Sequence, residues 1–204
     1  MIDIANQLAA IYREVSERPG EGGEDVVVLI RRSYDAEVED VWNAVTDPAC
    51  VKRWFLPLSG DLRAGGTFQL AGNASGDILG CEPPRLLRVT FGAPNSIVEL
   101  RLTANGDETV LELEHSVPKA MAQSVAGALY VGPGWDGAFL GLDLYLRGEA
   151  PEDPVAAASS PETQAFSKES VHAWTAVVEA SGAASEDEIA AATAVSMAQF
   201  APDA

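Results

Sequence analysis

The sequence predicts an α+β fold in which a curved antiparallel sheet wraps a long helix near its C-terminal end and leaves a cavity between them. Two observations predict it. A strand-like stretch over residues 26–34 precedes an amphipathic helix at 35–46 and a series of strands with alternating apolar residues between 67 and 115. After Pro118 the apolar spacing becomes helical, most clearly over residues 135–146. This order is typical of the helix-grip fold.

The N-terminal half supplies the first elements. Residues 3–18 are predicted to form a helix, because apolar side chains recur there at helical spacing and Pro19 follows. The strand over 26–34 comes next. The helix of residues 35–46 has one apolar stripe, with Asp35 as the expected cap before it and a proline just after it.

The central segments read as antiparallel strands, because apolar and polar residues alternate with a period of two. These strands are expected at residues 67–70, 86–91, 97–103 and 110–115. The sequence Asn-Gly-Asp at 105–107 predicts a hairpin turn between the last two.

The last quarter has a different composition. Residues 148–161 are rich in Ala, Pro and Ser and predict a linker, after which residues 166–180 read as a helix. The pattern Ser185-Glu-Asp-Glu188 is a capping box that predicts a further helix to about Phe200. We therefore expect a helix-grip domain over residues 1–148 and an acidic helical extension over 149–204 that packs on it.

Charge and composition exclude several classes of partner. The net charge is −18, and residues 149–204 contribute −9 of it, from ten acidic residues and one lysine. Such a chain repels the phosphate backbone of nucleic acids and anionic membrane surfaces. No apolar run approaches the roughly 20 residues that span a bilayer. Two separated cysteines argue against a disulfide scaffold or a zinc site, and no secretory signal is visible, so a cytoplasmic location is expected.

Two glycine-rich stretches resemble nucleotide-binding motifs only in part. Residues 132–137 match G-x-G-x-x-G, but the acidic residue of a true fingerprint would fall in the predicted linker. Residues 60–67 resemble a P-loop, but Gly66 stands where the phosphate-binding lysine belongs. No nucleophile elbow is present. We therefore expect no cofactor and no metal, and we find no catalytic motif.

His115 is the one weak candidate for a catalytic residue. Its alternation places it on the same strand face as Leu111 and Leu113, which is the face expected to look into the cavity. Two interpretations remain open: a structural histidine with satisfied hydrogen bonds, or a polar anchor or proton donor for a ligand. Asp136 is interpreted as a carboxylate that complements the dipole at the start of its helix.

Several motifs together resemble the START-type (SRPBCC) superfamily, and within it the branch named after the activator of the heat-shock-protein-90 ATPase. The matching segments are Glu39–Pro48, Arg53–Phe55, Gly60–Gly66, Gly76–Pro84, Leu111–His115 and Gly134–Leu142. They cover about residues 26–147, and the N-terminal helix and acidic tail are similar to an extended bacterial subgroup. The resemblance implies the helix-grip fold with its cavity. It implies no single chemistry, because relatives include lipid carriers, polyketide cyclases and aromatases, hormone receptors and proteins that sequester enediyne antibiotics.

The first hypothesis is a protein that carries or sequesters a hydrophobic, aromatic or polyketide-like small molecule, in natural-product biosynthesis or self-resistance. It would act as a monomer or homodimer. The residues expected to line the cavity are Phe68, Leu70, Phe91, Leu100, Leu102, Leu113, His115, Trp135, Phe139 and Leu142, with Trp54 and Phe55 near its mouth. The alternatives are a cyclase or aromatase that uses the same cavity, with proton transfer by His115, and a co-chaperone-like protein-interaction module that uses the acidic tail.

Overall fold

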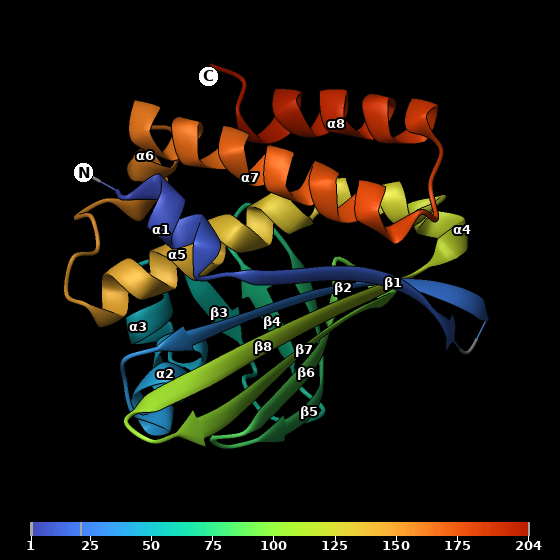
Figure 1. The fold of residues 1–204 in the computed structure, drawn as a ribbon. Helices are drawn as coiled ribbons and strands as arrows, with labels where there is room; N and C mark the ends of the chain where they lie inside the picture. Colours follow the sequence, from blue (N-terminus) through green and yellow to red (C-terminus); the bar gives the residue numbers. More distant parts are fainter. Residues whose placement is uncertain (1, 21, 204) are drawn as a thin grey trace. The chain divides into compact units, whose positions relative to one another are not determined.

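A computed structural model, which describes residues 2–20 and 22–203, has the α+β helix-grip fold that the sequence predicts (Figure 1). Its curved antiparallel sheet has eight strands in the order β1-β2-β8-β7-β6-β5-β4-β3. The strands are β1 Tyr12–Gly20, β2 Gly23–Tyr34, β3 Leu58–Gly60, β4 Thr67–Leu70, β5 Ser75–Glu82, β6 Leu86–Phe91, β7 Ala93–Asn105 and β8 Glu108–Pro118. The chain divides into two compact units, which we describe separately.

The first unit comprises residues 1–30, 116–140 and 156–204. Its N-terminal part corrects the predicted helix over 3–18, because the helix α1 spans only Ile4–Ala9 and the strand β1 follows. The apolar residues Ile11 and Val15 are four positions apart, a spacing that fits one face of a helix and one face of a strand equally well. Val15 lies in β1 and Ile11 directly precedes it; both side chains are buried and both are β-branched, which favours an extended chain.

Apart from the beginning of β2 and the end of β8, helices form the rest of the first unit. They are α4 Lys119–Ala122, η1 Val125–Tyr130, the first part of α5 (Gly132–Leu146), α6 (Pro154–Ala158, in the predicted linker), α7 Pro161–Ser181 and α8 Glu186–Phe200. α7 lies beside α8 and also contacts α1, β1 and η1 (Figure 1). Its fully buried residues include Phe166, Trp174 and Val178, so this helix forms the centre of the unit's apolar core. The capping box predicted at Ser185 and Glu188 is present.

The second unit comprises residues 31–115 and 141–155. It holds the helices α2 Val38–Thr46 and α3 Pro48–Val51, the strands β3 to β7 and parts of β2, β8 and α5. Glu37 rather than Asp35 precedes α2, without a side-chain cap. The strands β5, β6 and β7 pair antiparallel, with Leu87 opposite Leu100 and Val89 opposite Val98. The apolar partners on adjacent strands thus share one face of this sheet.

Among the described residues, no helix combines the length and the apolar character needed to cross a membrane.

Candidate functional site

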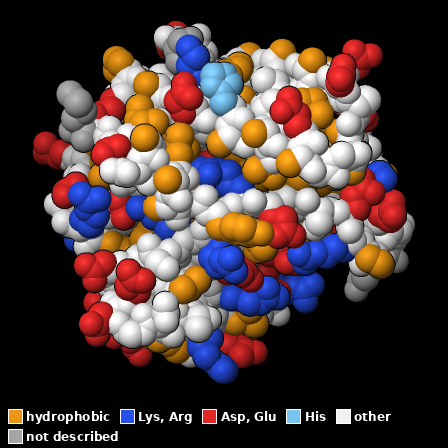
Figure 2. All heavy atoms as spheres, viewed as in Figure 1, with side chains coloured by type: hydrophobic (Ala, Val, Ile, Leu, Met, Phe, Trp, Pro, Cys, Tyr) orange, Lys and Arg blue, Asp and Glu red, His pale blue; other side chains and the backbone are white. Residues whose placement is uncertain are grey.

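A row of ion pairs identifies the outer face of the sheet in the second unit. Arg88 lies opposite Glu99 and pairs with it at 3.6 Å, Arg101 pairs with Glu112 at 3.4 Å, and Glu112 lies 3.9 Å from Arg31. Acidic and basic side chains are intermixed over β7 and β8 in Figure 2. Side chains alternate along each strand, so Arg32, Leu100, Leu111 and Leu113 lie on the opposite face. We call this the inner face.

The inner face is largely apolar and carries an aromatic cluster. Phe68 and Phe91 stack with their ring centroids 6.1 Å apart and their planes at 26°. Of the predicted lining residues in this unit, Phe68, Leu70, Leu102, Leu113 and Leu142 are buried, and Phe91 and Leu100 are half-buried. With Trp54, Phe55 and His115 included, the second unit holds ten of the twelve residues predicted to line the cavity. Trp135 and Phe139 belong to the first unit. For all twelve residues, a role in ligand binding stays a prediction.

Trp54 and Phe55 follow the short helix α3 and are half-buried. Their rings stack at 5.4 Å, and Trp54 Nε1 donates a hydrogen bond to the carbonyl of Ala44 at 2.9 Å. The C-terminal part of α5 passes close by, because a Cβ added to Gly141 would lie 3.1 Å from the Trp54 carbonyl oxygen. A glycine at this position lets the helix approach the aromatic pair closely.

His115 forms a polar pair with Ser96 on the inner face. The Oγ of Ser96 lies 2.8 Å from Nε2 of His115, and both residues are buried. The Phe91 ring meets the imidazole edge-on at 6.0 Å. Burial lowers the pKa of His115 from 6.5 to about 4, so the imidazole is neutral at physiological pH. Ser96 was not predicted, because the strand was expected to begin at residue 97, whereas β7 begins at Ala93.

The neutral histidine predicts a dependence of stability on pH. His115 binds a proton at pH 6.5 in the unfolded chain and only near pH 4 in the folded protein. Its contribution to folding is thus complete above 6.5 and is lost as the pH falls from 6.5 towards 4. Relative to His115→Gln, the wild-type protein is expected to lose about 3 kcal/mol of unfolding free energy between about pH 7.5 and pH 4.

Urea unfolding of both proteins at a series of pH values measures this difference. The comparison cancels every other titrating group, because only residue 115 differs. A difference that stays constant across this range would show that His115 titrates normally in the folded protein.

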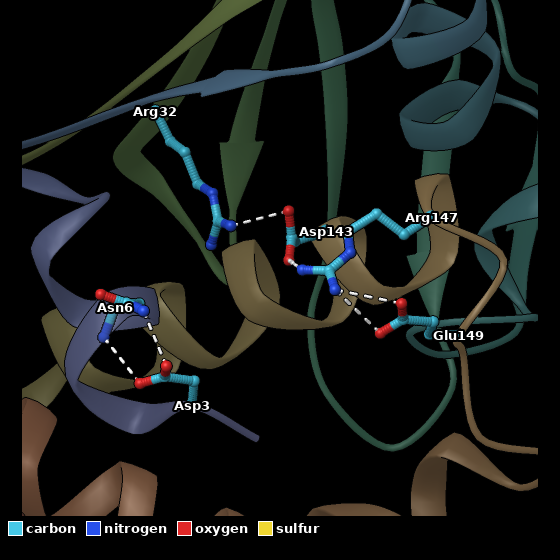
Figure 3. Close-up of polar contacts among 6 residues, drawn as sticks. All are labelled: Asp3, Asn6, Arg32, Asp143, Arg147 and Glu149. Atoms are coloured by element: carbon cyan, nitrogen blue, oxygen red, sulfur yellow. Dashed lines mark hydrogen bonds and ion pairs between the residues drawn. The ribbon is translucent and has the colours of Figure 1, made fainter. Parts of the chain in front are cut away.

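A buried ion pair is the second polar feature of the inner face. Nη2 of Arg32, on β2, lies 2.7 Å from Oδ1 of Asp143, on α5, and the two side chains are 5% and 12% exposed. Figure 3 shows that Asp143 also faces Arg147, whose Nη1 lies 3.3 Å from Oδ2. Arg147 in turn donates to both carboxylate oxygens of Glu149, at 3.0 and 3.1 Å. Alternating charges thus extend from the exposed Glu149 through Arg147 and Asp143 to the buried guanidinium of Arg32.

Arg32 was not among the predicted site residues, although the sequence contained a signal for it. Arg32 alternates with Ile30 and Tyr34, and all three are buried in the structure. The Arg32 guanidinium lies 5.2 Å from the centre of the Tyr34 ring, and burial raises the pKa of Tyr34 well above its usual range. An arginine at an inward position of a strand marks a buried charge that needs a partner.

A separate polar cluster lies inside the first unit. Nε of Arg13, on β1, donates to Oδ2 of Asp136 at 2.8 Å, and the Ser170 hydroxyl on α7 donates to the same oxygen at 2.5 Å. Burial raises the pKa of Asp136 to about 6, although Arg13 and Ser170 act in the opposite direction. α5 begins at Gly132 and has no acidic residue in its first turn, so the expected role of Asp136 as a carboxylate at the helix start is wrong, and Asp136 is a buried ion-pair partner instead.

Histidine, cysteine, aspartate and glutamate side chains are the usual protein ligands of metal ions. Within residues 2–20 and 22–203, no cluster of three or more His, Cys, Asp or Glu side chains could hold a metal ion. Cys50 and Cys81 are free thiols.

The sequence and the fold are similar to those of a known protein family. Residues 35–147 match the model of the family described as Activator of Hsp90 ATPase homolog 1-like protein. The crystal structure of CalU16 from Micromonospora echinospora is 44% identical, with a TM-score of 0.68, and the match covers 83% of this chain and 98% of CalU16. The solution structure of CalU16 is 43% identical over 84% of this chain and 96% of that protein, with a TM-score of 0.69.

More distant structures share less of the chain. The crystal structure of DynU16, a protein in the dynemicin biosynthetic locus, is 28% identical with a TM-score of 0.54, over 62% of this chain and 49% of DynU16. Curated proteins give no match. The family model covers more than half of the sequence, and the similarity to CalU16 extends over nearly all of that protein. The chain therefore belongs to the family of Activator of Hsp90 ATPase homolog 1-like proteins.

Proposed function

We propose that the protein binds a hydrophobic small molecule of aromatic or polyketide-like character against the inner face of the sheet, and carries or sequesters it. The fold and the family fit a ligand-binding role. The similarity to DynU16, whose gene lies in a biosynthetic locus, supports a natural product as the ligand.

The Ser96–His115 pair is the observation that carries the proposal. It is a neutral hydrogen-bonding pair buried beside the stacked Phe68 and Phe91 rings. Ligand sites in proteins combine an apolar, aromatic surface with a small number of fixed polar groups that orient the ligand. A serine hydroxyl donates one hydrogen bond and accepts two, so Ser96 can serve His115 and a ligand oxygen together.

A thermal-shift screen tests the proposal. The compounds are fatty acids, flavonoids, anthraquinones and polyenes, and a ligand present at 100 times its Kd is expected to stabilise the protein by about 2.7 kcal/mol. For a chain of this size, that raises the melting temperature by roughly 5–10 °C. If none of these classes raises the melting temperature of the folded protein, the proposed function is wrong.

The variant Ser96→Ala tests the role of the polar pair. Hydroxylated ligands are expected to bind about 2- to 10-fold more weakly, because one hydrogen bond is lost, whereas unsubstituted hydrocarbon ligands should keep their affinity. Titration calorimetry with a hydroxyanthraquinone and with anthracene measures both. Ser59→Ala, at an exposed position of β3, is the matched control. Equal losses for both ligands would indicate a change in packing and would contradict an anchoring role.

A further inference from the structure

We infer that Arg32 is the anchor of an acidic subsite, and that the bound molecule is an apolar acid whose carboxylate pairs with this guanidinium. The inference rests on the proposed function and specifies the chemical class of its ligand. Three features of the second unit support this inference. They are the position of Arg32, the contacts of its partner Asp143, and the neutral charge of the Ser96–His115 pair.

The position of Arg32 is the first feature. Its neighbour Arg31 lies on the outer face beside Glu112, so Arg32 lies on the inner face with the apolar lining. Its side chain is 5% exposed, whereas that of Arg31 is 47% exposed. A guanidinium shielded from water binds a carboxylate more strongly than an exposed one does, and its planar fork matches the geometry of a carboxylate.

The arrangement around Asp143 is the second feature. One carboxylate oxygen of Asp143 binds Arg32 and the other faces Arg147, which lies four positions further on, just after the end of α5 (Figure 3). When a ligand carboxylate takes the place of Asp143 at Arg32, Asp143 retains Arg147 as its counter-charge. The incoming acid can therefore exchange with Asp143 without leaving either carboxylate unpaired.

Stability alone gives a poor account of the Arg32–Asp143 pair. Taking both charges out of water costs about as much as their attraction returns, and apolar residues of similar volume often stabilise a core equally well or better. The Ser96–His115 pair adds the third feature, because it is neutral and supplies no charge to balance an anion. The ligand's charged end therefore belongs at Arg32, and its neutral oxygen atoms belong at Ser96.

Matched acids and amides test the inference. The probes are anthraquinone-2-carboxylate with its carboxamide, and dodecanoate with dodecanamide, titrated by calorimetry. In the wild-type protein, each acid is expected to bind about 10-fold or more tightly than its amide, because a charged hydrogen bond replaces a neutral one. The variant Asp143→Asn keeps the size of the side chain but removes the competing charge. It should tighten the binding of both acids by about 10-fold and leave both amides unchanged.

Two further variants separate binding from folding. The double variant Arg32→Met/Asp143→Leu removes both charges together, so it leaves no buried charge unpaired, and it is expected to abolish the preference for acids while the amides still bind. Arg31→Met removes the same charge from the outer face and should leave the preference intact. Circular dichroism and the melting temperature of each variant confirm the fold before titration.

The outcomes distinguish the two proposals. If acids and amides bind equally well in the wild-type protein and in Asp143→Asn, the pair is only a structural contact and the acidic subsite is wrong, while the proposed ligand-binding function stands. If no acid or amide of either pair binds to the wild-type protein, the inference is overturned. If the wider thermal-shift screen is also negative, the proposed function is overturned with it.

Discussion

Replacement of Arg13 by methionine is expected to lower the free energy of unfolding by about 3–5 kcal/mol at neutral pH, because it leaves the Asp136 carboxylate buried without its counter-charge. The Asp136 side chain is fully buried and that of Arg13 is 8% exposed. Arg13 also donates from Nη1 to the carbonyl oxygens of Leu8 and Ile11, so the change frees the end of α1 as well. Urea unfolding followed by circular dichroism measures the loss.

Two controls test the explanation. Arg18→Met removes the same charge from an exposed position of the same strand and should change the unfolding free energy by less than about 0.5 kcal/mol. Arg13→Met/Asp136→Leu removes both charges and should recover most of the stability. If the double variant is as unstable as Arg13→Met, lost packing rather than the unpaired carboxylate explains the effect.

The penalty of Arg13→Met should also depend on pH. The pKa of Asp136 is about 6 beside Arg13, and loss of the guanidinium raises it further. A carboxyl group with a raised folded-state pKa favours folding as the pH falls through that pKa, because the folded state takes up the proton first. The penalty of Arg13→Met is therefore expected to shrink as the pH falls from about 7.5 towards 6.

Truncation of Trp174 is the second change with a large expected effect. Trp174→Ala should cost about 3–5 kcal/mol, because the side chain is fully buried and its removal leaves a cavity that the surrounding residues fill only in part. The packing around the indole is tight, since a Cβ added to Gly132 would lie 2.5 Å from its Cε2 atom. Thermal and urea unfolding measure the loss.

Val195→Ala provides the comparison for Trp174→Ala, because Val195 lies on α8 in the same unit and is 52% exposed. This change should alter the unfolding free energy by no more than about 0.5 kcal/mol. A small effect of Trp174→Ala would mean that α7 is not the centre of the apolar core of the first unit.

Local patterns predicted the elements whose chemistry is also local. The alternation along residues 110–115 and the capping box at Ser185 each reflect contacts within a few positions, and both elements are present in the structure. The N-terminal segment was predicted wrongly, because a spacing of four between Ile11 and Val15 fits a helix and a strand alike. Only pairing with another strand decides between them, and pairing is a long-range property.

The polar pairs depend on long-range contacts in the same way. Arg32 and Asp143 are 111 positions apart, Arg13 and Asp136 are 123, and Ser96 and His115 are 19. A single sequence identifies residues that need a partner when they are buried, but it does not identify the partner. The alternation placed His115 on the same face as Leu113, whereas Ser96 emerged only from the structure.

The first unit is assembled from segments that are far apart in the sequence, which affects the order in which the protein can fold during translation. In this unit β1 contacts α7, so residues about 140 positions or more apart in the sequence pack together in its core. During translation β1 leaves the ribosome long before α7 is synthesised, so the apolar side chains of β1 stay exposed to solvent until then. The second unit, by contrast, contains one long continuous stretch of the chain. The strands β3 to β7 can therefore pack together early in translation, whereas the first unit is completed only after α7 and α8 have been synthesised.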